Sequence, residues 1–556
     1  MKHYKSLIAL SAALLISAVP AFQFTPGLSD YHLTASAEDD YTVSFQYEID
    51  GAEAIITGYT FEGGNEQTLH QLVLPDEAEG VPVTKIKSYA FSDCTQIGSV
   101  TLSKNIKEIK NSAFKNCTNL SEFNFNENLE TIGDSAFYKC GITEAIIPDS
   151  VKKIGTSVFS TCEFLSHAKL PSGIDTVSAN MFINCYSLKT VDFPEKLTMI
   201  NAGAFENCTG LTSMIIPEGV TYTAICSFQN CSGLETLLLP ESLETIGQYA
   251  FRNCSSLKSV TIPSRIERIS YEAFNSCSSL ETVNLPEVLT DIGGGAFYKC
   301  SSLRNINFPD TLESIGSCAF KNCSSITEVV LPESVTSIGD STFANCENLE
   351  SVTLTDYVKN IGSFAFLSCG KITSIRLPER LSTISHSMLA NTGITEIRIP
   401  VFCTEINDSA FQGTKLKNVV IPAMTDTINS KAFADCTELE SVKILNSECY
   451  ISDYKTNFSN GSDENDNDIL NTVIYGLPGS TAESYAEKYG YTFKETQHIA
   501  GDANGDGELS VSDAVMLQKW LSESSALICP YNVDYDSDDC ISVFDLCRLK
   551  RELLKF

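Results

Sequence analysis

Two short acidic stretches near the end of the chain carry the residues best suited to chemistry. In GDANGDGELSVSD, at 501–513, oxygen-bearing side chains stand at loop positions 1, 3, 5, 9 and 12, with glycine at position 6 and a backbone carbonyl at position 7. A hard cation such as calcium is bound by this kind of oxygen set. The predicted ligands of the first loop are Asp502, Asn504, Asp506, Glu508 through its carbonyl, Ser510 and Asp513.

The same spacing recurs 32 residues later. Position 6 of this second loop is Asp539 in place of glycine. That position needs a left-handed backbone, which Asp adopts at some cost, so the second site is expected to bind calcium more weakly. The predicted ligands of the second loop are Asp534, Asp536, Asp538, Cys540 through its carbonyl, Ser542 and Asp545.

A helix is expected to follow each loop. When the two helices are aligned, apolar residues spaced by three and four fall at matching positions and form one face on each helix. We expect these faces to pack against each other. The matched pairs are Ala514 and Leu546, Leu517 and Leu549, and Leu521 and Leu553.

Two loop-helix units that each end in Asp resemble a type I dockerin, here over residues 501–556. The resemblance implies calcium at both sites and a partner, the cohesin module of a scaffoldin, as in cellulosomes. The two sets of contact positions differ, which weighs against the near-symmetric double binding mode of the family. The positions that commonly contact cohesin fall on Val511, Ser512, Gln518 and Lys519, and on Val543, Phe544, Lys550 and Arg551.

Most of the chain ahead of these loops is one phrase repeated, as in SLETVNLPEVLTDIGGGAFYKC at 279–300. LxxVxL supplies a short alternating strand, a proline ends it, and the AFxxC segment buries a second apolar edge. The step is 23 residues, shortened to 22 three times. Such a period predicts a solenoid of about sixteen units, since no unit could bury its apolar surface alone. The anchor positions are Phe91, Phe114, Phe137, Phe159, Phe182, Phe205, Phe228, Phe251, Phe274, Phe297, Phe320, Phe343, Phe366, Leu389, Phe411 and Phe433.

The pattern LxxVxLP followed by IGxxAFxxC resembles the BspA-like leucine-rich repeats of bacterial surface and secreted proteins, over residues 68–445. The expected fold is mainly a β solenoid, a right-handed leucine-rich repeat array, followed by a small all-α dockerin. A hairpin signal at Asp50 and Gly51 predicts an N-terminal cap at 38–67. A strand and a helix over about 481–489 are similar to the closing cap of that family, here 446–494, and residues 495–500 form a linker.

Fourteen of the 21 cysteines occupy one repeat position, from Cys94 to Cys436. Thr392 and Thr414 fill the same position in two units, as expected where only a small buried side chain is needed. Equivalent side chains of stacked units point the same way, which is poor disulfide geometry. We therefore predict unpaired structural thiols rather than reactive or metal-binding ones.

The outward residue of each LxxVxL strand forms what we call the strand row. The row contains no aromatic residue, so a platform for sugar stacking is not evident from it. Small polar and aliphatic residues, with cations near the end, favour a protein-contacting surface. The row is Thr101, Asn124, Ile146, Lys169, Asp192, Ile215, Leu238, Thr261, Asn284, Asn307, Val330, Thr353, Arg376, Arg398, Val420 and Lys443.

A second row consists of the Asp and Glu residues that follow the strands, and we call it the acidic stripe. A glycosidase places one pair of carboxylates in a cleft, in unlike environments, whereas this row is repetitive. Two interpretations remain for it: a solvated face, or a site for cations or a basic partner. The stripe is Asp149, Glu195, Glu218, Glu241, Glu287, Asp310, Glu333, Asp356 and Glu379.

The start of the chain predicts export. Two lysines precede an apolar run from Leu7 to Val19, and cleavage candidates end at Ala21 and Ala37, so residues 1–37 are interpreted as a signal peptide. The net charge of −32 opposes nucleic-acid binding and membrane insertion. We expect a secreted, extracellular protein held on a cellulosome or cell surface through a scaffold.

No catalytic residue and no organic cofactor site is predicted. His167 and His386 lie ten repeats apart, so they cannot converge in a triad. The predicted function is a non-catalytic recognition or adhesion protein that presents its repeats to a protein, cell or polysaccharide. The alternatives are a plant cell wall polysaccharide-degrading enzyme, either hydrolase or lyase, and a protein inhibitor or adhesin. The enzyme would depend on Asp192, the only acid in the strand row.

Overall fold

The structure of the 556-residue chain is a computed structural model. The described residues are 31–36, 41–63, 70–304, 306–465, 467–496, 501–503, 508–523, 533 and 543–555. The predicted signal peptide lies outside them, apart from residues 31–36, and so does the predicted linker from residue 497 onward. The chain divides into two compact units, Met1–Ser213 with Pro217–Val220 and Met214–Ile216 with Thr221–Phe556.

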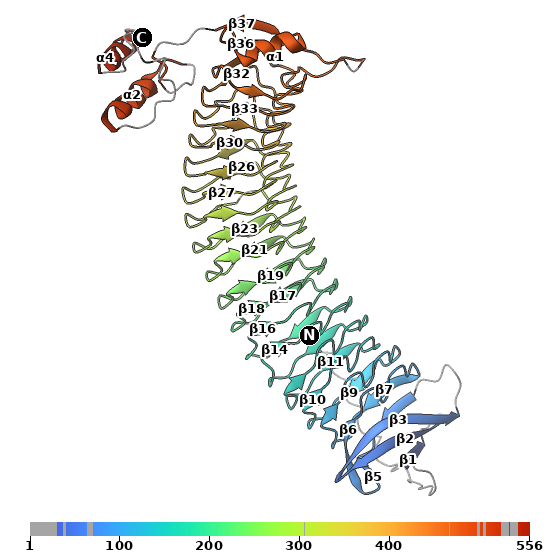
Figure 1. Cartoon of the computed structure of the whole chain (residues 1–556). Helices are drawn as coiled ribbons and strands as arrows, with labels where there is room; N and C mark the ends of the chain where they lie inside the picture. Colours follow the sequence, from blue (N-terminus) through green and yellow to red (C-terminus); the bar gives the residue numbers. More distant parts are fainter. Residues whose placement is uncertain are drawn as a thin grey trace, which may run out of the picture. The chain divides into compact units, whose positions relative to one another are not determined.

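The first unit opens with an antiparallel hairpin of β2 (Tyr41–Asp50) and β3 (Glu53–Gly63), with β1 (Tyr31–Ser36) along the other edge of β2 (Figure 1). Gly51 occupies the turn with φ of 62°, a conformation that glycine adopts at no steric cost. The hairpin therefore lies where the sequence predicts it. Its strand β3 pairs in parallel with β6 (Val81–Ile86), which begins one of the two ladders of the repeats.

Most turns of the repeat region contribute to two parallel ladders. The first ladder is built from the predicted LxxVxL strands. In the first unit its strands are β4 (His70–Val73), β7 (Ile97–Thr101), β9 (Glu122–Asn124), β11 (Glu144–Ile146), β13 (His167–Lys169) and β15 (Thr190–Asp192), while β17 (Ser213–Ile215) spans the unit boundary. The strands β4, β7 and β9 pair with one another, and β11, β13 and β15 form a separate sheet.

The second ladder is a feature that the sequence does not predict. It consists of strands of mostly two residues just before the glycine turn, too short for a period-2 pattern to reveal. In the first unit it contains β6, whose first two residues also pair with antiparallel β5 (Glu77–Ala78), and then β8 (Glu108–Ile109), β10 (Thr131–Ile132), β12 (Lys153–Ile154), β14 (Thr176–Val177) and β16 (Met199–Ile200).

The second unit repeats this plan. Its first-ladder strands are β19 (Thr236–Leu238), β21 (Ser259–Thr261), β23 (Thr282–Asn284), β26 (Glu328–Val330), β28 (Ser351–Thr353), β32 (Asn418–Ile421), β34 (Ser441–Ile444), β36 (Val473–Gly476) and β37 (Thr492–Glu495). Its second-ladder strands are β18 (Tyr222–Thr223), β20 (Thr245–Ile246), β22 (Arg268–Ile269), β24 (Asp291–Ile292), β25 (Ser314–Ile315), β27 (Ser337–Ile338), β29 (Asn360–Ile361), β30 (Thr383–Ile384), β31 (Glu405–Ile406), β33 (Thr427–Ile428) and β35 (Tyr450–Ile451).

The core of the repeats is a stack of the anchor phenylalanines. Neighbouring rings lie between 4.9 and 5.8 Å apart and are close to parallel, and every anchor side chain is fully buried. In the second unit the stack continues past Phe433 to Phe458, at 5.8 Å, an anchor that follows after an irregular step. The stacked rings hold successive turns in one register.

The strand and the helix predicted near the end of the repeats are both present. In the chain, helix α1 (Thr481–Tyr489) follows β36 and precedes β37. It begins where the Ser480 side chain accepts a hydrogen bond from the Glu483 amide. It ends at Gly490, in the left-handed conformation. Two further helices, α2 (Val511–Glu523) and α4 (Val543–Leu553), pack against each other.

The hairpin cap contains a buried histidine, from which we predict acid sensitivity. His70 is 1% exposed, contacts the rings of Tyr41 and Phe61, and lies with Nδ1 3.3 Å from the Tyr59 hydroxyl. Burial lowers the pKa of His70 from its ordinary value of 6.5. The unfolded cap therefore binds more protons, so its stability is complete above pH 6.5 and falls as the pH drops below that value.

Hydrogen exchange of β2 and β3 checks this expectation. Protection of these strands should decrease between pH 7.5 and 5.5, and His70→Leu should remove most of that decrease. His167→Leu, at a half-buried histidine in β13, is the matched control and should behave as the unmodified chain. Equal acid loss in the His70→Leu protein would contradict the assignment.

Candidate functional site

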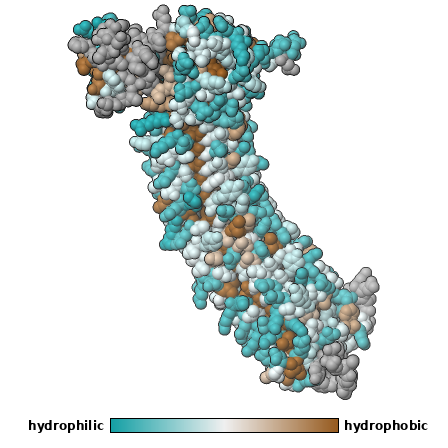
Figure 2. All heavy atoms as spheres, viewed as in Figure 1, coloured by the Kyte–Doolittle hydropathy of each residue, from teal (hydrophilic) through white to brown (hydrophobic). Residues whose placement is uncertain are grey.

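Within each unit the strand row lies on the outward side of the first ladder. Within β19 and β26, for example, Leu238 and Val330 are 54% and 50% exposed while the residue before each is buried. Figure 2 shows hydrophobic patches of this kind within a mostly hydrophilic face. The predicted alternation is confirmed, and the row is available for contact with a ligand.

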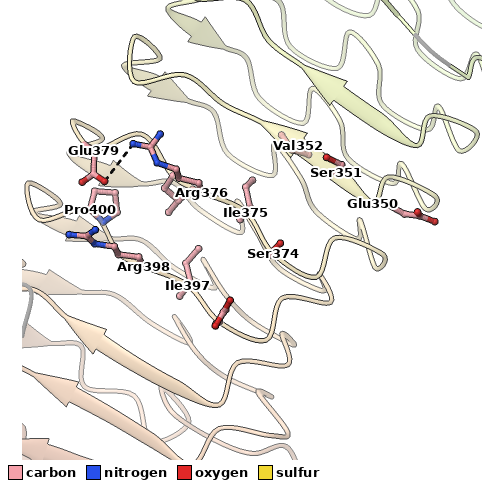
Figure 3. A pocket seen from close by; sticks show the side chains of 12 residues that line it. Glu350, Ser351, Val352, Ser374, Ile375, Arg376, Glu379, Ile397, Arg398 and Pro400 are labelled. Carbon is pink, nitrogen blue, oxygen red and sulfur yellow. Dashed lines mark ion pairs between the residues drawn. The ribbon is translucent and has the colours of Figure 1, made fainter. Parts of the chain in front are cut away.

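A hollow of about 700 Å³ opens on this surface in the second unit. Arg376 and Arg398 lie side by side on one edge, near Glu379 and Pro400, and Glu350 lies on the opposite edge (Figure 3). Arg376 forms a two-pronged ion pair with Asp356, at 2.9 and 3.0 Å. The hollow is therefore polar and of mixed charge.

The hollows coincide with turns shortened by one residue. The hollow of the second unit lies between β28 and β32, where residues 374–376 and 396–398 are not in strands, and a shortened turn falls at 389–411. A similar hollow in the first unit, also about 700 Å³, lies where β9 and β11 belong to different sheets. Where neighbouring segments do not pair, the ladder is interrupted and space is left on its face.

The acidic stripe has a structural role that the sequence does not reveal. Asp149 accepts a hydrogen bond from the Ser172 amide of the next turn at 2.8 Å, and Glu241 accepts one from the Ser264 hydroxyl, also at 2.8 Å. These bonds hold the pKa of Asp149 and of Glu241 below its usual range. The carboxylates tie successive turns together as well as facing solvent.

The cysteine ladder is built as predicted. Each buried thiol donates to the carbonyl of the phenylalanine one turn earlier, as Cys277 does to Phe251 and Cys300 to Phe274, both at 3.2 Å. Burial raises the pKa of Cys277 to about 12. A thiol with so little thiolate is a poor nucleophile. The free thiols of the ladder include Cys94, Cys117, Cys140, Cys162, Cys185, Cys254, Cys277, Cys300, Cys323, Cys346, Cys369 and Cys436.

We expect the ladder thiols to resist alkylation in the native protein. Brief treatment with iodoacetamide at pH 8 should modify Cys547, which is exposed on α4, and leave Cys277 and Cys300 unmodified. Peptide mapping reads each site, and the same treatment in denaturant should label all three. Labelling of Cys277 at the rate of Cys547 would contradict this assignment.

The carboxylate on which an enzyme would depend lies beside a histidine. Asp192 on β15 is 3.7 Å from His167 Nε2, and Nδ1 of that histidine lies 2.8 Å from the Thr190 hydroxyl. Glycosidases need two carboxyl groups flanking the scissile bond. The arrangement is a surface contact between neighbouring strands with a single carboxylate, and it gives the enzyme alternative no specific support.

The helix pair α2 and α4 packs through the predicted apolar faces. Ala514, Leu517, Leu546 and Leu549 are buried in one cluster, and Trp520 lies partly buried against it. All predicted cohesin-contact positions with a described side chain are exposed, while the Phe544 side chain is not among the described ones. Lys550 donates to Gln518 at 3.0 Å and so joins the two sets. The exposed positions are Val511, Ser512, Gln518, Lys519, Val543, Lys550 and Arg551.

Several predicted calcium ligands lie outside the described residues. These are Asn504, Asp506, Asp534, Asp536, Asp538, Cys540 and Ser542. Among the residues that the structure does describe, no three His, Cys, Asp or Glu side chains converge as a metal site. Of the other predicted ligands, Glu508 is exposed and Ser510 is half-buried.

Three of the described ligand carboxylates are nevertheless almost fully buried. Asp502 is 2% exposed, and Asp513 and Asp545 are 0% exposed. Asp513 accepts hydrogen bonds from the Ser510 amide at 2.8 Å and the Ser510 hydroxyl at 3.2 Å. Burial of carboxylates is costly unless their charge is compensated. The oxygen donors of these residues are of the kind that a calcium ion takes as ligands.

Residues 84–212, 198–327, 290–415 and 404–465 match the model of the BspA type leucine rich repeat region. Together these matches span more than half of the chain. The chain therefore belongs to the BspA-type leucine-rich repeat family. No curated protein matches it. No helix of the described residues is long and apolar enough to span a membrane.

Solved structures of leucine-rich repeat proteins also resemble the chain. A leucine rich cell surface protein from Faecalibacterium prausnitzii is 30% identical, with 62% of this chain and 94% of that chain covered and a TM-score of 0.42. A leucine-rich repeat protein from Bacteroides ovatus is 24% identical, with 62% and 95% covered and a TM-score of 0.46. The pneumococcal vaccine antigen PcpA is 18% identical, with 84% and 98% covered and a TM-score of 0.38.

Proposed function

We propose that this chain is an exported, non-catalytic recognition protein with two functional parts. Its C-terminal helix pair, a type I dockerin ordered by calcium, docks onto a cohesin module of a cellulosomal scaffoldin. Its repeats present the strand row to a ligand on a protein, a cell or a polysaccharide. In that role the helix pair sets where the repeats are displayed.

The observation that carries the docking half is the burial of Asp502, Asp513 and Asp545. All three stand at predicted calcium positions and are almost fully buried, beside helices whose predicted contact residues face outward. Calcium bound at these loops would fix the starts of α2 and α4. It would thereby hold Val511 and Val543, which are 70% and 62% exposed, in position for a partner.

The test is a pull-down of the full chain against a panel of type I cohesin modules, with calcium and with chelator. The proposal expects calcium-dependent retention by at least one cohesin. The same samples, incubated with insoluble plant cell wall, report binding by the repeats and any release of reducing sugar. Absence of binding to every cohesin in calcium would overturn the docking half, and sugar release that Asp192→Asn abolishes would establish the enzyme instead.

A further inference from the structure

The face of the closing sheet has an unusual composition for so acidic a protein. The chain has 70 acidic and 38 basic residues. Of the outward positions of β32, β34, β36 and β37, all of which the structure describes, none is acidic; Glu495, the exposed last residue of β37, belongs to the alternate set with Phe493. They are Asn418, Val420, Ser441, Lys443, Val473, Tyr475, Thr492 and Lys494.

Strand pairing aligns the central residues of this face in one line. Val420 pairs with Lys443, Lys443 with Tyr475, and Tyr475 with Lys494. Paired residues of parallel strands lie about 4.8 Å apart on the same side of the sheet. The tyrosine ring therefore lies between two lysines, and Lys494 Nζ is 5.8 Å from the centre of that ring. Within the described residues neither lysine forms an ion pair.

We infer that this face binds an acidic polysaccharide, a polymer that contains uronate residues. This inference rests on the proposed function and names a ligand class for the repeats. Lys443 and Lys494 pair with carboxylates on the sugar rings, while the half-buried Tyr475 offers an aromatic surface for the apolar face of a sugar. Ser441 and Asn418, joined by a 2.6 Å hydrogen bond, supply polar groups for sugar hydroxyls.

Charge and spacing favour a uronate polymer over an acidic peptide. The two lysines lie about two strand spacings apart, with a ring between them, which suits carboxylates carried by every second cyclic unit. In an extended peptide, side chains on the same face recur about every 6.6 Å, which does not match the spacing of the ladder. Acidic side chains of a peptide would also make no apolar contact with the aromatic ring between the two lysines. The net charge of −32 does not prevent binding, because charges farther than about 8 Å are largely screened at physiological salt.

The experiment is affinity electrophoresis of the full, calcium-loaded chain in gels that contain polygalacturonate. A gel with the methyl-esterified form of the same polymer, whose carboxylates are neutral, is the ligand control. We expect Lys443→Glu with Lys494→Glu to weaken retention by at least about tenfold. We expect a similar loss for Tyr475→Ala and retention near the unmodified level for Tyr475→Phe, which preserves the ring.

The matched control variant is Lys152→Glu with Lys359→Glu, which makes the same charge change at exposed lysines outside the face. It should stay within about twofold of the unmodified chain. Equal binding to the esterified polymer, equal losses in both double variants, or poly-glutamate binding as tight as polygalacturonate would each overturn the inference. Cohesin binding is measured on the same proteins, so its presence without polygalacturonate binding would leave the docking proposal in place.

Discussion

Removal of calcium is expected to abolish cohesin binding by the full chain and to unfold the pair of α2 and α4. Asp513 and Asp545 are fully buried at the last position of each predicted loop. Calcium bound at these positions would fix the start of each helix, and its removal takes away the binding free energy that orders the pair. A chelator should therefore lower cohesin affinity by more than about 100-fold. Calorimetry with and without calcium measures both effects.

Single-residue variants separate the two loops. Asp513→Asn should cost most of the affinity, whereas Asp545→Asn should cost less, because Asp539 already weakens the second site. Asp192→Asn, at an exposed residue of the strand row, makes the same chemical change elsewhere and should leave cohesin binding unchanged. A chelated chain that binds cohesin as tightly as the calcium-loaded chain would contradict the calcium assignment.

The periodic part of the fold could be predicted from the sequence because the physical requirement repeats. Each turn needs one large ring and one small donor. The equivalents of Phe274 and Cys277 in the other turns can therefore be found from the repeat spacing alone. Helix α1 can also be predicted from the sequence, since Ser480 and Gly490 are ordinary start and stop signals of a helix. Phe458 was missed because an irregular step separates it from Phe433, although its ring continues the same stack.

Features that depend on pairing between turns could not be predicted. The hollow beside Arg376 and Arg398 exists because adjacent segments do not join the ladder, and one segment's sequence does not encode that outcome. Tyr475 and Lys494 come from the closing strands rather than from a repeat, so only their register brings them into line with Lys443. The calcium positions remain a prediction from the sequence, which can be made because their spacing is local.

Truncation of one ring in the stack is expected to have the largest effect on stability. Phe274 is fully buried, 5.4 Å from Phe251 and 5.7 Å from Phe297. Phe274→Ala removes the ring and leaves a cavity, which costs about 3–5 kcal/mol. Phe274→Leu is the matched control and should cost less than about 1.5 kcal/mol, since Leu389 occupies the same position in another turn.

Urea unfolding, monitored by circular dichroism, measures the loss in free energy of unfolding. It also shows how far along the chain each substitution destabilises the turns. Each anchor contacts only the turns before and after it, so the loss of Phe274 weakens the coupling between the turns on its two sides. The Phe274→Ala protein should therefore unfold in two transitions, with the earlier one reporting turns next to the cavity. A single transition shifted as a whole would instead mean that the repeats unfold cooperatively, and equal losses for Ala and Leu would mean that the site requires an aromatic ring.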